Sequence, residues 1–238
     1  MRGPYGFEMN GGCHICKLKK AGFFCHLSPQ AIKDLDSLKS SSAYPEGAVL
    51  FMEKQDPRGV FLLCEGEVKL TISSSEGKTL ILRIAKPGEI LGLVSTLSGK
   101  PYEVTAETLR PCHVVYIRRA DFMRLVAQHP EFLQGVVKQL SANYQNACEQ
   151  LRTVGLSSSA PEKLARMLLE WSAGAQNSGQ GTEIKMPLTH EEIAELIGSS
   201  RETVTRTLGE FKSRHLLTLK GSTLLIWNRA ALESFVSA

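Results

Sequence analysis

The chain has 238 residues, of which 42% are hydrophobic and 22% charged, with a formal net charge of +4 at pH 7. This length and composition fit two domains, each with a buried core. No apolar run is long enough for a membrane span and no secretory signal begins the chain, so we expect a soluble, cytoplasmic protein without a membrane partner. The modest charge also excludes nucleic-acid binding through a bulk positive field; such binding would depend on local placement of charges.

The N-terminal segment, residues 1–28, carries three closely spaced cysteines, Cys13, Cys16 and Cys25, in the sequence CHICKLKKAGFFCHL. In a cytoplasmic protein a CxxC pair favours a metal or redox site over a structural disulfide. The lysines between the cysteines favour the thiolate form and would offset the charge of an anionic cluster. A metal cluster, a bound zinc ion, a thiol redox switch and the absence of any metal all remain open at this point.

Residues 29–129 are predicted to form a strand-rich domain. Glycines recur through residues 44–120 and separate short apolar stretches such as VFLLC, VKLTI and TLILRI, which is typical of strands joined by tight turns. The segment SEGK at 75–78 is expected to form the turn of a hairpin. Closely spaced short strands predict a barrel or a double-sheet β-roll.

Residues 130–156 are predicted to form one long helix, with Pro130 at the start, where a missing N–H costs nothing. Apolar residues then follow at alternating steps of four and three, which indicates the seam of a parallel coiled coil. We therefore expect a homodimer paired along this helix; the alternative is a helix that packs only on its own domain. The predicted dimerisation residues are Leu133, Val137, Leu140, Tyr144, Ala147, Leu151 and Val154.

Residues 157–238 contain the most informative stretch of the chain, THEEIAELIGSSRETVTRTLGEFKSR. It predicts two short helices joined by a tight turn. Thr189 and Glu192 form a capping box for the first helix, and Gly198 ends it where a positive φ is wanted. Ser199 or Ser200 begins the second helix. The following LLTLK-GS-TLLIW predicts a hairpin, so the whole domain is expected to be a winged helix-turn-helix.

The second of these helices carries polar groups on the side opposite its expected core. Arginine offers a fork of donors that matches O6 and N7 of guanine, and glutamate accepts from the N4 amino group of cytosine. Glu202 could instead be a helix-start carboxylate favoured by the dipole, while serine and threonine hydroxyls are expected at phosphates. We predict sequence-specific contacts to double-stranded DNA through Ser200, Arg201, Glu202, Thr203, Thr205 and Arg206.

The stretch SRETVTRTLGEF resembles the recognition helix of the CRP/FNR superfamily of bacterial transcription regulators. The resemblance covers nearly the whole chain. It implies an α+β fold: a cyclic-nucleotide-binding-like β-roll sensor domain, a dimerisation helix and a C-terminal winged helix-turn-helix. It also implies a homodimer on a palindromic DNA site, and contact with RNA polymerase. Because Arg201 is present, as in the cyclic-AMP receptor branch, the half-site would be closer to TGTGA than to the TTGAT of the FNR branch.

The N-terminal cysteines are similar to those of the oxygen-sensing FNR branch, in which three such cysteines and a fourth in the roll hold a [4Fe–4S] cluster. The resemblance implies the same cofactor here, bound by Cys13, Cys16 and Cys25, with Cys112 as the fourth ligand. In that branch the cluster promotes dimerisation and DNA binding, and oxygen dismantles it.

This chain departs from the FNR pattern at two places. The gap between Cys16 and Cys25 is longer than usual, and a gapless alignment puts the family's fourth cysteine at Val115, on the opposite strand face from Cys112. The fourth donor could therefore be a histidine or an external ligand, and the histidine candidates are His14, His26 and His113.

Cyclic-nucleotide binding is not expected. The nucleotide-binding branch supplies a Glu and then an Arg-Ser pair for the phosphate, but the corresponding positions here are Leu93, then Tyr102 and Glu103. An enzyme is not expected either, because the chain has no nucleophile-elbow, Walker or HExxH pattern. A metal-binding adaptor that does not contact DNA would require the helix pair to be a packing unit alone.

Overall fold

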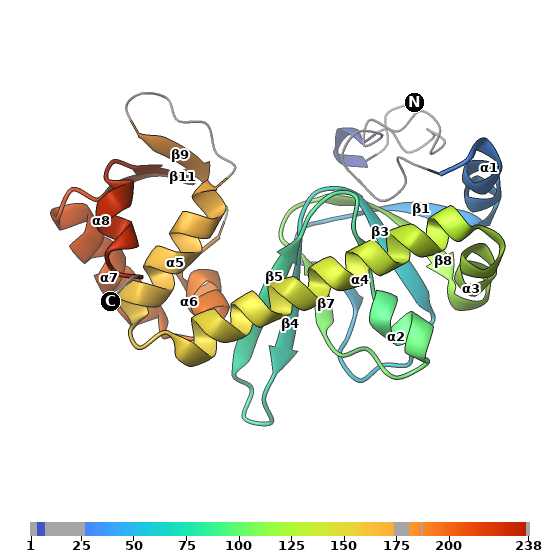
Figure 1. Ribbon diagram of the computed structural model, residues 1–238, viewed down its shortest axis with the longest axis horizontal. Helices are drawn as coiled ribbons and strands as arrows, with labels where there is room; N and C mark the ends of the chain where they lie inside the picture. Colours follow the sequence, from blue (N-terminus) through green and yellow to red (C-terminus); the bar gives the residue numbers. More distant parts are fainter. Residues whose placement is uncertain (1–3, 8–26, 174–180, 187, 237–238) are drawn as a thin grey trace. The chain divides into compact units, whose positions relative to one another are not determined.

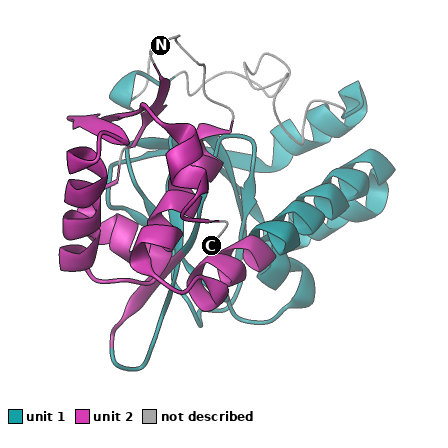
Figure 2. Cartoon of the chain, turned by 60° about the vertical axis from the view of Figure 1, so that its left-hand side comes forward, with its two compact units in different colours: residues 1–76, 82–146 teal, residues 77–81, 147–238 magenta. Residues whose placement is uncertain are grey.

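The computed structural model describes residues 4–7, 27–173, 181–186 and 188–236. Within these ranges the chain divides into two compact units: residues 1–76 with 82–146, and residues 77–81 with 147–238 (Figure 2). Helices and strands occur in both (Figure 1), which confirms the predicted α+β class. Cys13, Cys16 and Cys25 lie outside the described residues, as do His14 and His26.

The first unit is built on two four-stranded sheets, as the double-sheet prediction required. Their strand orders are β1-β8-β3-β6 and β2-β7-β4-β5, with antiparallel pairing throughout the registers that are recorded. The predicted turn at 75–78 lies between β4 and β5. In chain order the strands are β1 (Lys39–Tyr44), β2 (Val49–Phe51), β3 (Gly59–Glu65), β4 (Val68–Ser73), β5 (Thr79–Ala85), β6 (Ile90–Leu91), β7 (Thr105–Thr108) and β8 (Cys112–Arg118).

Two apolar clusters fill the first unit, and strand β3 contributes to both. Since successive side chains of a strand point to opposite faces, Val60 and Leu62 join the cluster beneath the helices. Phe61 and Leu63 join the cluster between the two sheets. Both faces of β3 are therefore covered, which explains why VFLLC is a continuous apolar run instead of an alternating one.

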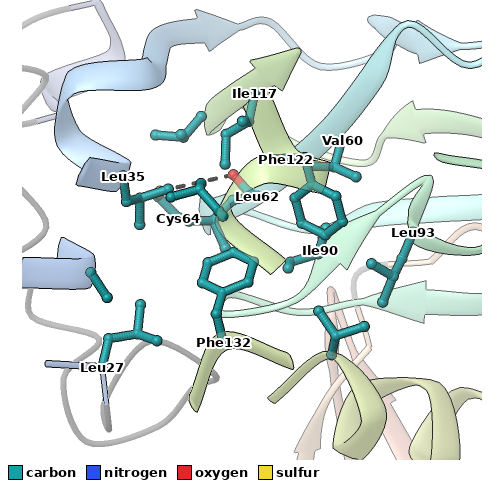
Figure 3. Packing of buried hydrophobic residues seen from close by; sticks show 14 residues of the cluster. Leu27, Leu35, Val60, Leu62, Cys64, Ile90, Leu93, Ile117, Phe122 and Phe132 are labelled. Atoms are coloured by element: carbon teal, nitrogen blue, oxygen red, sulfur yellow. Dashed lines mark hydrogen bonds between the residues drawn. The ribbon is translucent and has the colours of Figure 1, made fainter. Parts of the chain in front are cut away.

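Helices cover the outer face of the β1-β8-β3-β6 sheet. These are α1 (Pro29–Leu38), α2 (Leu93–Ser98), α3 (Arg119–Gln128) and the first half of α4 (Pro130–Leu151). Figure 3 shows the sheet residues gathered with the rings of Phe122 from α3 and Phe132 from α4. The two rings meet edge to face, with their centroids 5.6 Å apart. The start of α4 is thus part of the core of the first unit.

The predicted helix over residues 130–156 exists, but its last turn differs from the rest. The α-helix ends at Leu151, and residues Arg152–Leu156 form a π-helix in which the Ser157 N–H donates to the Arg152 carbonyl at 3.1 Å. A π turn holds one more residue than an α turn. Gly155, a weak helix former, lies inside it.

The second unit has the winged helix-turn-helix arrangement that the sequence predicts. A three-stranded sheet of order β10-β11-β9 adjoins four helices, and β10 and β11 form the wing hairpin. The elements are α5 (Ala160–Ser172), β9 (Thr182–Lys185), α6 (His190–Ile197), α7 (Arg201–Ser213), β10 (Leu217–Lys220), β11 (Thr223–Ile226) and α8 (Arg229–Glu233). In the described part of the chain, no helix combines the length and apolar character needed to cross a membrane.

Candidate nucleic-acid interface

Helix α6 begins and ends where its capping signals predict. The Thr189 hydroxyl accepts from the Glu192 N–H at 3.2 Å, and the Glu192 carboxylate accepts from the Thr189 N–H at 2.9 Å. Gly198 ends the helix at φ 62°, in the left-handed region that favours glycine. A Cβ at Gly198 would lie 3.0 Å from Val154 Cγ1, so space as well as conformation restricts this position.

The inner faces of α6 and α7 pack together in the interior of the second unit. Ile193 and Ile197 of α6 are fully buried, and so are Val204 and Phe211 of α7. The small Ala194, which lies between Ile193 and Ile197 in the sequence, is also buried. The predicted core of the helix pair is therefore confirmed, and it fixes which side of α7 turns outward.

The outward side of α7 carries the residues predicted to read DNA. Arg201, Glu202, Thr205 and Arg206 are all exposed. Neither arginine takes part in an ion pair with any residue that the structure describes. Two unpaired guanidinium groups near one helix start are well suited to donate hydrogen bonds to guanine edges or phosphates. Contact with DNA itself stays a prediction for each of these residues.

The first turn of α7 uses its own polar groups for capping. The Ser200 Oγ accepts from the Thr203 N–H at 3.2 Å and lies 3.0 Å from the Thr203 hydroxyl. The Glu202 carboxylate accepts from its own backbone N–H and from the Ser200 side chain. These bonds, with the nearby Arg201 charge, hold the pKa of Glu202 below its ordinary value. Glu202 thus has the helix-start environment that the alternative interpretation proposed, and it remains an exposed acceptor.

The two sides of helix α4 differ sharply in environment. Phe132 and Val136 are buried in the core of the first unit. On another side, Leu133, Val137, Tyr144 and Leu151 are 45%, 53%, 73% and 70% exposed. Large apolar side chains left exposed in a row indicate a surface that a partner covers. This is the arrangement expected for a dimerisation seam.

Two members of the predicted seam, Leu140 and Val154, differ from the others because they contact other parts of the chain. Leu140 is half-buried and packs against the first unit's own core. Val154 falls in the π turn, where its methyl group lies beside Gly198. A straight helix drifts from a strict seven-residue repeat, and the π turn adds a further change of phase. Leu140 and Val154 therefore make contacts within the chain, and their part in the dimer seam stays a prediction.

Cys112, predicted as the fourth cluster ligand, does not fit that role. The thiol is fully buried between the two sheets and donates to the carbonyls of Arg110 at 3.1 Å and Glu67 at 3.4 Å. Burial raises the pKa of Cys112 above its ordinary value, although metals bind the thiolate form. Strand alternation turns this side chain into the roll, away from the face of β8 on which Val115 and Ile117 meet the helices.

His113, one of the alternative donors, lies on the other face of β8. Its Nε2 is 2.6 Å from Ser41 Oγ, and its ring stacks on Phe7 with centroids 6.1 Å apart. Phe7 is the last described residue before the segment that carries the cysteines. Burial lowers the pKa of His113, which favours the neutral imidazole that metals bind. Among the described residues alone, no group of three metal-binding side chains occurs.

The positions that the family resemblance assigns to cyclic-nucleotide binding have contacts within the domain itself. Tyr102 is buried, its ring stacks on Phe51 with centroids 4.1 Å apart, and its hydroxyl donates to the Gly59 carbonyl at 2.7 Å. Leu93 is buried in the cluster beneath the helices. The Glu103 carboxylate accepts from the Ser95 hydroxyl. None of these three side chains carries a positive charge for a phosphate, and the expectation that no cyclic nucleotide binds stays a prediction.

Comparison with known proteins decides the family. Residues 42–129 match the cyclic nucleotide-binding domain, and residues 162–235 match the Crp-like helix-turn-helix domain. The chain is a CRP/FNR family transcription regulator. As members of this family, such helix-turn-helix regulators bind DNA, act as dimers and are not enzymes.

Individual relatives of this CRP/FNR regulator share low sequence identity with it, but they align over most of its length. It is 28% identical to the CRP-like cAMP-activated global transcriptional regulator of Mycobacterium tuberculosis, over 88% of this chain and 93% of the relative. It is 23% identical to the nitrogen fixation regulation protein FixK of Bradyrhizobium diazoefficiens, over 97% of both. The fold is that of FixK2 from Bradyrhizobium japonicum, with a TM-score of 0.73 at 20% identity, covering 84% of this chain and 98% of that one.

Proposed function

We propose that this regulator binds as a homodimer to a palindromic DNA site whose half-sites are closer to TGTGA than to TTGAT. The observation that carries the proposal is the exposed, unpaired state of Arg201 and Arg206 beside Glu202 on α7. A two-fold dimer presents two such helices about 34 Å apart, one turn of DNA. Glu202 and Arg206 would read the core that the two half-site types share, and Arg201 would add a guanine.

Selection from random-sequence DNA tests this proposal directly. We expect enriched sequences with two-fold symmetry and half-site centres about 10 base pairs apart. Selected DNA without that symmetry would overturn the palindromic site. Enrichment of TTGAT, unchanged in an Arg201→Ala variant, would show that Arg201 does not contribute base selectivity.

The dimer seam has its own test in Val137→Glu. Val137 is exposed in the single chain, so the variant should keep its fold while losing its partner, because a carboxylate cannot be buried in an apolar seam without a large penalty. Its melting temperature should fall only by the part that dimerisation contributes. Sedimentation should show a monomer that no longer holds the palindromic site. Lys138→Glu, at the next exposed position, is the matched control. A Val137→Glu protein that remains a dimer would exclude this seam.

We further propose that a cofactor bound by Cys13, Cys16 and Cys25 controls DNA binding, and that it is a [4Fe–4S] cluster. When bound, it would supply sensitivity to oxygen or to redox state. The support from the described residues lies directly after the cysteine segment. Leu27 is buried in the same cluster as Phe132 and Val136 of α4. A change in the N-terminal segment would therefore act on the helix that carries the seam.

Polar contacts strengthen this connection between the N-terminal segment and α4. The Ser28 hydroxyl caps α1 and also donates to the Glu131 carboxylate at 2.7 Å. This hydrogen bond is the largest of the effects that lower the pKa of Glu131 below its ordinary value. One turn further along α1, Asp34 lies 3.0 Å from Nε2 of His129, the residue before α4. The coupling needs only a few kcal/mol to change occupancy of a DNA site substantially.

Anaerobic purification followed by iron, sulfide and zinc analysis tests the cofactor. We expect iron and acid-labile sulfide in equal amounts, and Cys16→Ala should lose both. Zinc without sulfide would show a zinc site in place of the cluster. If neither iron nor zinc is found, the remaining alternatives are a thiol switch and a regulator without a metal. Contact with RNA polymerase follows from family resemblance, and transcription in vitro from a promoter carrying the selected site would test it.

A further inference from the structure

His190, which no sequence motif singled out, lies against the predicted reading face. It is the first residue of α6 and is partly exposed. Its Nδ1 lies 2.9 Å from the hydroxyl of Thr205, an exposed residue of α7. The imidazole therefore joins the two helices on the side that carries Arg201 and Arg206.

The hydrogen bonds of Thr205 fix which ring nitrogen of His190 carries a hydrogen. A threonine hydroxyl has one proton, and Thr205 donates it to the Arg201 carbonyl at 2.9 Å. Toward His190 the same oxygen can only accept, so Nδ1 is the donor. A neutral imidazole has a single N–H, which leaves Nε2 with a bare lone pair. Protonation adds the second N–H at Nε2 without breaking the bond to Thr205.

We propose that His190 is a further residue of the DNA interface, which binds a backbone phosphate through Nε2 in its protonated form. A phosphate oxygen only accepts hydrogen bonds, so a bare Nε2 would repel it, whereas the imidazolium offers both an N–H and a charge. DNA binding then takes up as much as one proton per protomer and strengthens as the pH falls. The inference rests on DNA binding by the helix-turn-helix, whichever half-site is read.

The charged groups that flank His190 and Thr205 on the two helices are carboxylates and arginines. Beside His190 in α6 are Glu191 and Glu192, and the carboxylate of Glu192 is engaged by the cap. The groups flanking Thr205 on α7 are Arg201, Glu202 and Arg206. Arginine stays protonated, and carboxylates ordinarily titrate well below pH 6. Any proton taken up between pH 8 and pH 6 by this face therefore points to His190.

DNA affinity measured by fluorescence anisotropy from pH 8 to pH 6, at constant salt, tests the proposal. For the full-length protein on its selected site, we expect affinity to rise about tenfold or more on going down this range, since each proton taken up gives as much as tenfold per pH unit. His190→Gln keeps a donor for Thr205 but cannot gain charge, so its profile should be flat. His190→Lys should bind tightly with a flat profile, because lysine is charged throughout.

His215→Asn is the matched control, because His215 is an exposed histidine of the same unit whose positive φ asparagine tolerates. It should retain the full pH dependence. At pH 6, His190→Gln should also lower the salt dependence of binding by about one phosphate contact per protomer. A His190→Gln protein that keeps the pH dependence of the parent would overturn the proposal. Base selectivity, measured alongside, reports separately on Arg201 and Arg206.

Discussion

The β-roll and the helix-turn-helix unit both have the fold of their family, but they differ in how well their polar groups match the family's function. In the roll, the fold persists while Tyr102 and Phe51 occupy the space between the sheets and Glu103 stands where a cation would be needed. In the helix-turn-helix, the interior is equally well filled, but Arg201 and Arg206 remain exposed and unpaired among the described residues. A buried pattern therefore preserves the architecture of both units, while the exposed polar groups differ in what they leave free to contact a partner.

The largest effect should come from opening the interior of the roll. Phe51→Ala removes a buried ring that packs against Phe61 and Tyr102. We expect a loss of about 3–5 kcal/mol in the free energy of unfolding, because the lost burial and the cavity add together. Denaturant unfolding measures this loss. A variant that gained affinity for cyclic AMP at little cost in stability would contradict the contrast between the two units.

The second effect concerns DNA and should leave stability unchanged. Arg206→Ala removes an exposed guanidinium without ion-pair partners in the described structure. We expect a cost of about 1–3 kcal/mol in binding and relaxed selectivity at one guanine. Competition binding with sites altered at single positions would measure both. A uniform loss across all sequences would instead make Arg206 a phosphate contact.

A smaller effect separates the two candidate fourth ligands in the roll. Cys112→Ala should keep the iron content of the parent and lose roughly 1 kcal/mol of stability, as a small buried group does. His113→Ala should lower the iron content if the imidazole is the fourth donor. The reverse result, iron lost in Cys112→Ala and kept in His113→Ala, would restore the ligand set that the resemblance implied.

Alkaline titration gives a second view of Cys112. Because the pKa of its thiol is raised by burial, the folded protein holds this proton more tightly than the unfolded chain. The resulting stability is fully present below the ordinary pKa of cysteine and is lost as the pH rises through the raised value. Tyr102 and Tyr116 have raised pKa values for the same reason and add a later loss. Cys112→Ala should remove the earlier part of the decline.

The smallest expected effect is none at all. Cyclic AMP at millimolar concentration should leave the melting temperature and DNA affinity unchanged, because Leu93, Tyr102 and Glu103 offer no positive charge to its phosphate. A ligand present at 100 times its Kd would stabilise the protein by about 2.7 kcal/mol, which a thermal melt readily detects. A clear shift would show that the roll binds nucleotides in a way that these contacts do not suggest.

Local chemistry explains what the sequence could predict. The capping box of Thr189 and Glu192, the positive φ of Gly198 and the buried face of α7 each depend on residues within a few positions. The strands were predictable because VFLLC and its neighbours are separated by turn signals. Such features survive in any context that lets the element form.

Tertiary contacts explain the rest. Leu140 has the right spacing for the seam, yet only the packed core shows that it also contacts the interior of the first unit. Cys112 has the right chemistry for a metal, yet its strand face points it between the sheets. His190 meets Thr205 across a turn, through a contact that neither helix reveals alone. The cysteines Cys13, Cys16 and Cys25 lie outside the described residues, so their ligand role stays a prediction.

The π turn over Arg152–Leu156 has a consequence for how this regulator could be retuned. Its one surplus residue offsets everything downstream by about 100° of rotation and 1.5 Å of rise relative to an uninterrupted α-helix. Deleting Gly155 would remove that offset and leave the sequence of α7 unchanged. A single-codon deletion would therefore change the direction in which the chain leaves this helix.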